Sequence, residues 1–131
     1  MTSSRQTCWP RSNSAADSES IRRALGDSVD ALERATGWIA ATFGRDVRAA
    51  AAGATPYLRL FGAVLGGWAL YLSARAAQRM ASEARGNRAF VNAKRATATF
   101  YAETTLALAP ALAAQAMAGA DAVMALADDD F

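Results

Sequence analysis

The stretch that most restricts the fold is TPYLRLFGAVLGGWALYLSA, residues 55–74, in which Arg59 is the only charge. A run of about 20 apolar residues is long enough for a helix to cross a bilayer. Gly62 and Gly66 have the Gly-x-x-x-Gly spacing at which lipid-embedded helices approach each other. Arg59 lies near the start of the run, where a long side chain can reach an interface, so this charge does not exclude a membrane span.

The aromatic residues and the remainder of the chain favour a protein interior for this run. Tyr57, Trp68 and Tyr71 do not mark two interfaces, because two of them lie together past the middle. The other predicted helices are amphipathic, and their apolar stripes need a central partner. We therefore expect the run from Tyr57 to Ala74 to be wrapped by protein. Its expected helix-packing positions are Gly62, Gly66 and Gly67.

The composition predicts an all-α protein. Alanine, the best helix former, supplies roughly a quarter of the residues. Hydrophobic residues make up 53% of the chain and charged residues 20%, which is too apolar for a disordered protein. A length of 131 residues suits one domain.

Apolar spacing and capping residues predict where the first helix lies. Residues 1–17 have no apolar period, and we expect a disordered tail there. A helix should begin near Asp17 or Ser18 and end before Gly44, which is expected to adopt the left-handed cap conformation. Its predicted apolar stripe comprises Ile21, Leu25, Val29, Leu32, Ile39 and Phe43.

Three further helices are expected after a short helical or turn segment at residues 46–54. Thr55 and Pro56 should cap and start a helix that runs to about Glu83. A third helix should follow Gly86-Asn87 and break before Pro110. Its predicted face comprises Phe90, Ala93, Thr97, Phe100, Tyr101 and Thr104. A shorter fourth helix should run from Pro110 to about Ala127. The predicted architecture for residues 18–131 is an antiparallel bundle of three long helices plus this shorter one.

Missing residue types exclude several chemistries. Histidine is absent and Cys8 is the only cysteine, so a Ser/His/Asp set, an internal disulfide and an ordinary zinc site are excluded. We predict no catalytic, cofactor-binding or metal-binding residues. The first 20 residues lack the apolar run of a signal peptide, and we expect a cytoplasmic protein.

Charge is unevenly distributed although the formal net charge is only +2. Residues 44–95 hold nine Lys or Arg against two acids, whereas residues 96–131 hold five acids and no base. Nucleic-acid binders usually concentrate Lys and Arg on one face and interleave aromatic residues, whereas here the acidic end offsets the basic middle. We therefore expect no nucleic-acid partner.

Two runs of the sequence, GATPYLRLFGAVLGGWAL and AKRATATFYAETTLALAPALAAQAMAGADAVMAL, resemble a known family. They are similar to the C-terminal extension domain of one branch of the acyl-CoA dehydrogenases, called acetyl-CoA dehydrogenase C-terminal-like. This domain occurs in bacterial oxidoreductases similar to the 3-methylmercaptopropionyl-CoA dehydrogenases. The resemblance covers about residues 20–131.

The resemblance implies a helical, non-catalytic accessory domain. In the family this domain follows a dehydrogenase body that binds FAD and the acyl-CoA thioester and supplies the catalytic glutamate. Residues 1–17 are too few to contain that body, so we expect a stand-alone or truncated chain whose partner is the body or a second copy of itself. The family's catalytic glutamate lies in the body, so its role does not transfer to Glu103.

Three residues are candidates for an interface, namely Arg59, Trp68 and Glu103. In an antiparallel arrangement Arg59 lies about ten residues along the axis from Glu103, roughly 15 Å, so we expect the two not to pair. We expect Arg59 instead to reach Asp46, backbone carbonyls or the dehydrogenase body. Asp30 and Arg34, four residues apart, are expected to form an exposed helix pair.

Two alternatives from other classes stay open. One is a small membrane-associated helical protein anchored by residues 56–74. The other is a helical acyl-CoA-binding module in which the basic middle of the chain holds phosphates.

Overall fold

The computed structural model describes residues 14–83 and 87–130. Within these ranges the chain forms helices and no strand, as the composition predicts. The α-helices are α1 (Ser14–Phe43), α2 (Val47–Ala52), α3 (Ala54–Ser82), α4 (Arg88–Thr104) and α5 (Ala109–Ala116). Three 3-10 turns complete the order, namely η1 (Leu106–Leu108), η2 (Val123–Ala125) and η3 (Asp128–Asp130).

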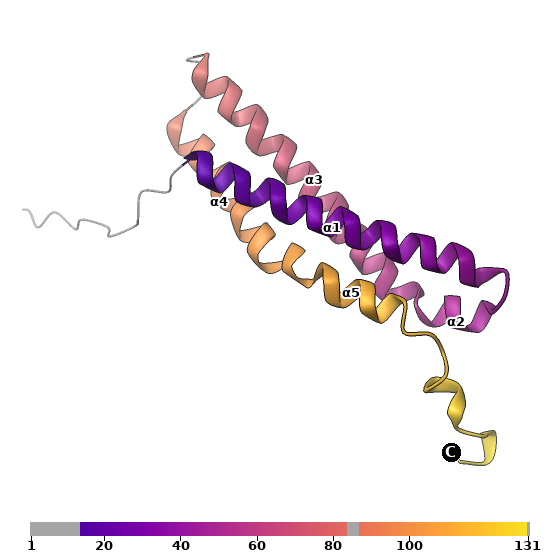
Figure 1. The fold of residues 1–131 in the computed structure, drawn as a ribbon. Coiled ribbons are helices and arrows are strands. Elements are labelled where there is room, and N and C mark those ends of the chain that lie inside the picture. Colours follow the sequence, from indigo (N-terminus) through magenta and orange to yellow (C-terminus); the bar gives the residue numbers. More distant parts are fainter. Residues whose placement is uncertain (1–13, 84–86, 131) are drawn as a thin grey trace, which may run out of the picture.

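The helices form an antiparallel bundle of three rods (Figure 1). α1 is one rod and α3 is the second, and the short α2 lies at the turn between them. The third rod is made by α4, η1 and α5, which follow one another along the bundle. The all-α bundle predicted from the sequence is therefore confirmed. The segment after α5 leaves the bundle at the end where α2 lies.

The start of α1 and the cap at its other end differ from those predicted. The helix begins at Ser14, before the expected start at Asp17 or Ser18, and residues 1–13 of the predicted tail lie outside the described residues. α1 ends at Phe43 as expected, but Gly44 does not take the left-handed conformation. Among the described residues the glycine with a positive φ is Gly119. A side chain caps the end instead, since Nε of Arg45 donates to the carbonyl oxygen of Ala41 at 3.1 Å.

The caps of α2, α3 and α4 have simple local causes. Oδ1 of Asp46 accepts a hydrogen bond from the amide of Ala49 at 3.0 Å and starts α2. Gly53, and not the predicted Thr55, is the N-cap of α3, and Pro56 lies in the first turn, where its missing amide is harmless. Asn87 caps α4 through the amide of Ala89 at 2.8 Å.

Pro110 interrupts the third rod as predicted, but the helix that follows is shorter than expected. α4 ends at Thr104, η1 continues the path, and Pro110 lies in the first turn of α5. α5 ends at Ala116 instead of near Ala127, and Gly119 has a φ of 80°, which helical residues do not adopt. Beyond it the chain forms only the short turns η2 and η3.

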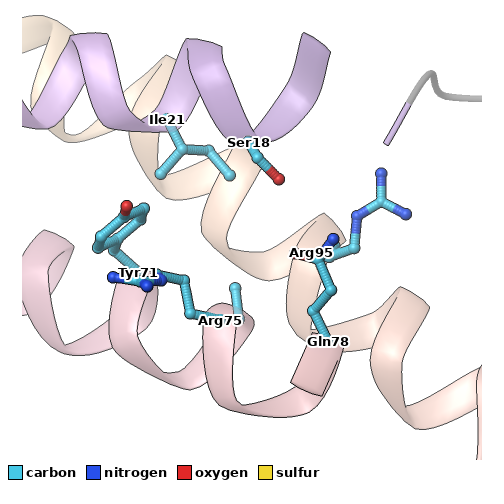
Figure 2. Close-up of a pocket in the computed structure, with 7 residues that line it drawn as sticks. Ser18, Ile21, Tyr71, Arg75, Gln78 and Arg95 are labelled. Carbon is cyan, nitrogen blue, oxygen red and sulfur yellow. The ribbon is translucent and has the colours of Figure 1, made fainter. Parts of the chain in front are cut away.

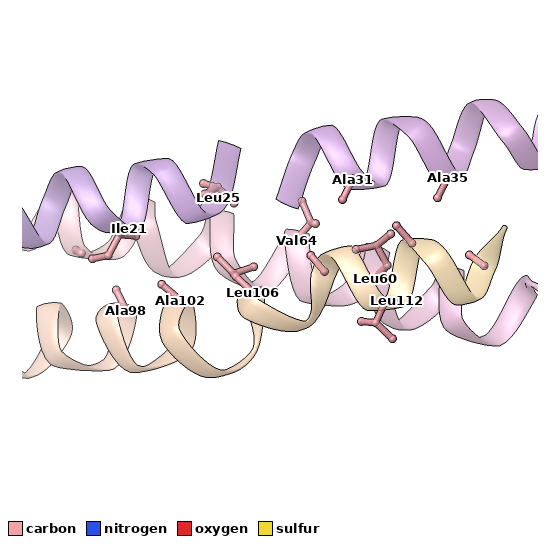
Figure 3. Close-up of a cluster of buried hydrophobic side chains, with 14 residues drawn as sticks. Ile21, Leu25, Ala31, Ala35, Leu60, Val64, Ala98, Ala102, Leu106 and Leu112 are labelled. Carbon is pink, nitrogen blue, oxygen red and sulfur yellow. The ribbon is translucent and has the colours of Figure 1, made fainter. Parts of the chain in front are cut away.

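Small side chains make up most of the core between the rods. The buried cluster (Figure 3) comprises Ile21, Leu25, Ala31, Ala35, Leu60, Val64, Ala74, Ala98, Ala102, Leu106, Ala109, Leu112, Ala113 and Ala116. Eight of these fourteen residues are alanine, so the helix backbones can lie close together. Ser28, also buried, satisfies its hydroxyl by donating to the carbonyl oxygen of Ala24 at 2.7 Å.

The predicted faces of α1 and α4 are partly wrong. In α1, Ile21 and Leu25 are buried as expected, but Val29 and Phe43 are exposed, and Ala31 and Ala35 are buried instead. In α4 the buried residues are Val91, Ala98 and Ala102. Phe90 and Phe100 are exposed. In the second half of α1 and in α4, the face toward the core is therefore marked by small residues and not by the largest ones.

Candidate docking face on helix α3

The outward side of α3 carries a continuous stripe of large apolar side chains. These residues, which we call the docking face, are Leu58, Phe61, Leu65, Trp68 and Leu72. They follow one another at spacings of three and four residues, which places them on one side of a helix. Each is between 41% and 71% exposed. Exposed apolar patches of this kind mark contacts with other molecules.

This stripe overturns the expectation that residues 57–74 are wrapped by protein within the chain. Only the opposite side of α3 is enclosed, where Leu60 is 0% exposed and Val64 and Gly67 are buried. α3 is apolar on both sides, and the other two rods cover only one of them. Among the described residues α3 is also the helix long and apolar enough to cross a membrane by length and composition, with 33% of its most apolar window buried.

The first half of α3 is fixed to α1 by a polar contact. The hydroxyls of Thr36 and Tyr57 lie 2.9 Å apart in a hydrogen bond, and the ring of Tyr57 lies 6.5 Å from that of Phe61, centroid to centroid. Beside this contact α1 carries a shallow groove, lined by Val29, Leu32, Glu33, Thr36 and Gly37. The Phe61 ring of the docking face therefore lies near the polar contact that joins α1 and α3.

The other half of α3 is flanked by basic side chains. Cζ of Arg75 lies 5.7 Å from the centroid of the Tyr71 ring, within the range of a cation–π contact. A cavity of about 140 Å³, shown in Figure 2, lies between α1, α3 and α4 at this end. Its lining consists of Ser18, Ile21, Tyr71, Ala74, Arg75, Gln78 and Arg95.

An exposed ion pair on α1 lies close to this basic end. Nη2 of Arg22 lies 2.7 Å from Oε1 of Glu19. The hydrogen bond between them lowers the pKa of Glu19 and raises the pKa of Arg22. The predicted pair between Asp30 and Arg34 does not form. The ion pair in the described part of α1 joins Glu19 and Arg22 instead, near the N-terminal end of the helix.

The predicted interface residues lie in three different places. Trp68 is part of the docking face and 53% exposed. Arg59 and Glu103 are also exposed, on α3 and α4, and neither has a hydrogen bond or ion pair to another residue in the described ranges. Arg59 does not reach Asp46, whose carboxylate caps α2.

The three predicted packing glycines also differ from one another. A Cβ built on Gly66 would lie 2.5 Å from Oη of Tyr101, and one on Gly67 would lie 2.9 Å from Cδ2 of Leu106. α4 and η1 therefore approach α3 closely at these two positions. Gly62 does not take part in intrachain packing, because a Cβ there would meet nothing within 4 Å.

Sequence reasoning missed Tyr101 as a polar link and Gly53 as a packing glycine. The hydroxyl of Tyr101 donates to the carbonyl oxygen of Ala63 at 3.1 Å. A Cβ on Gly53 would collide with the carbonyl group of Ala116, so the start of α3 and the end of α5 touch by their backbones. No local signal reveals either contact, since each joins segments far apart in the sequence.

The described residues contain no group of three or more acidic, cysteine or histidine side chains able to hold a metal ion. The arrangement is an all-α helical bundle with an exposed apolar face on α3. A family model, acetyl-CoA dehydrogenase C-terminal like, matches residues 3–127, and the chain belongs to this family of C-terminal domains of the acyl-CoA dehydrogenase superfamily. No curated protein and no solved structure gave a match.

Proposed function

We propose that this chain is a non-catalytic accessory domain of an acyl-CoA dehydrogenase and that its docking face mediates contact within the enzyme assembly. In this proposal FAD and the acyl-CoA substrate are bound by the flavin-containing body, carried on the same polypeptide or on another. The domain acts in the cytoplasm and contributes structure, not chemistry.

The observation that carries the proposal is the two-sided character of α3. Its inner side fills the bundle, and its outer side exposes five large apolar residues in one row. Burying the exposed half of one such side chain contributes on the order of 1 kcal/mol, so the five together contribute about 5 kcal/mol before the cost of association is subtracted. Family membership supports a dehydrogenase as the assembly in which the contact is made.

The two alternative functions find less support in the geometry. A bilayer would have to replace the contacts of the inner side of α3 with the other rods, although those contacts bury Leu60 completely. The basic cavity, about 140 Å³, is smaller than the roughly 300–1,000 Å³ of ordinary ligand pockets and does not suit an acyl-CoA.

The test uses the flavin-loaded dehydrogenase body from the same organism. Light scattering would give the mass of the assembly formed with wild-type chain, with Leu65→Glu and with Phe100→Glu. Phe100 is 67% exposed on α4 and serves as the matched control. We expect a larger assembly with the wild type and with Phe100→Glu, and its loss with Leu65→Glu. Equal masses for all three, or recovery of the chain only in detergent, would contradict the proposal.

A further inference from the structure

We propose that the docking face binds the same face of a second copy of this domain, with the two α3 helices antiparallel and a two-fold axis passing beside Leu65. This inference rests on the proposed function and names the partner at that site. It depends on three features of the docking face and its surroundings, which are the order of the side chains, the positions of small residues and the placement of charges.

The order of large side chains is nearly the same in both directions along α3. Leu58 and Leu72 each lie seven residues from Leu65, and an aromatic residue lies between the centre and each end. Antiparallel alignment about Leu65 places Leu58 beside Leu72 of the second copy. It also places Leu65 beside its own counterpart. A two-fold contact requires such self-complementarity, because the same patch serves both subunits.

Small residues lie where the aromatic side chains need room. In this alignment Trp68 is level with Gly62 of the second copy, and Phe61 is level with Ala69. Gly62 is exposed and a Cβ there would meet nothing within 4 Å, so packing inside the chain does not account for a glycine in mid-helix. Large side chains opposite small ones allow two helices to approach closely.

Charges beside the docking face also favour the antiparallel arrangement. Arg22 and Glu33 are eleven residues apart, three helix turns, and lie on one side of α1. Arg22 is close to Tyr71, and Glu33 precedes by three residues the Thr36 that contacts Tyr57. The antiparallel pair brings Arg22 to the level of Glu33 of the second copy. A parallel pair would instead set Trp68 against Trp68 of the second copy.

A residue beside a two-fold axis lies next to its own counterpart, and a cysteine there reports the symmetry. In the background of Cys8→Ser we expect Leu65→Cys, treated with oxidised glutathione, to give a disulfide-linked dimer. Leu58→Cys and Leu72→Cys should link weakly alone and strongly when mixed. Phe100→Cys, exposed on α4, is the control and should stay monomeric.

Sedimentation of the unmodified chain supplies the second measurement. We expect twice the 13.7 kDa mass for the wild type and for Phe100→Glu, and the single mass for Leu65→Glu with an unchanged circular dichroism spectrum. A monomeric wild type, or no Leu65→Cys link, would overturn this inference. If the wild type were monomeric but Leu65→Glu abolished assembly with the flavin-loaded body, the proposed function would stand and only the inference of a second copy would fail. If Leu65→Glu changed neither the mass of the dimer nor assembly with the flavin-loaded body, this inference and the proposed function would both be contradicted.

Discussion

The hydroxyl of Tyr101 on α4 donates a hydrogen bond to the carbonyl oxygen of Ala63 on α3, 3.1 Å away. The Ala63 carbonyl lies in a helix, so the tyrosine adds a second partner to a group that the helix ladder already uses. The ring reaches this position because residue 66 has no side chain, and a Cβ there would lie 2.5 Å from the hydroxyl oxygen. One missing methyl group thus sets how closely α3 and α4 approach.

Replacing Gly66 by alanine is expected to displace this ring. Gly62→Ala, compared at a dilution where the chain is monomeric, is the matched control, because it lies one turn away in the same helix with open space around it in the single chain. Both changes gain the same helix propensity, about 1 kcal/mol, so their difference isolates the clash. We expect Gly66→Ala to be less stable than Gly62→Ala by about 2 kcal/mol in urea unfolding. Equal stabilities would show that α4 does not depend on this gap.

Tyr101→Phe removes the hydroxyl and keeps the ring. The expected loss is about 1 kcal/mol, the ordinary contribution of one hydrogen bond, or about 3–5 °C in melting temperature for a domain of this size. Differential scanning calorimetry measures it. Combining Tyr101→Phe with Gly66→Ala should cost less than the sum of the two single changes, since both act on one contact. Strict additivity would argue against that coupling.

Gly53→Ala is expected to separate α3 from α5. The φ of Gly53 is −82°, which alanine adopts without strain, but the new methyl group would collide with the carbonyl group of Ala116. Because backbone atoms cannot swing aside, we expect a loss of about 3 kcal/mol of unfolding free energy. Gly44→Ala, where a Cβ meets nothing within 4 Å, should change it by less than about 0.5 kcal/mol.

Two leucines on opposite sides of α3 distinguish core packing from surface contact. Leu60 is 0% exposed and Leu65 is 53% exposed. Leu60→Ala should lower the unfolding free energy by about 3 kcal/mol, because it leaves a cavity in the core. Leu65→Ala should lower it by less than about 1 kcal/mol at a dilution where the chain is monomeric. Similar losses from the two changes would mean that the outer side of α3 is also covered within one chain.

The sequence predicted the helices better than it predicted their faces. Helix ends near Phe43 and Glu83 are predicted from the glycines that follow them, and Pro110 lies at the start of a new helix as predicted, although α4 already ends at Thr104 and Gly44 is not left-handed. The face of α4 could not be read in the same way. Phe90 and Phe100 stood out by their size, yet Ala98 and Ala102 face the core. In a chain where alanine is common everywhere, alanine spacing carries little signal, although it determines how closely the rods pack.

The same reasoning explains the wrong expectation for residues 57–74. An apolar helix with amphipathic neighbours was assigned to the centre of the bundle, but that assignment requires neighbours on all sides. Leu58 and Trp68 are exposed because α1, α4 and α5 occupy only one side of α3. Local sequence reports the polarity of a helix and not the number of its partners. An apolar face that contacts a separate molecule therefore looks, in the sequence, like buried core.

We expect the outer side of α3 to contact protein when the domain functions. Hydroxyl-radical footprinting of Trp68 in the assembly with the flavin-loaded body measures this directly, with Phe100 as the internal reference. We expect Trp68 to be labelled several-fold less in the wild-type assembly than in the Leu65→Glu chain, while labelling of Phe100 stays the same. Equal labelling of Trp68 in both samples would contradict it.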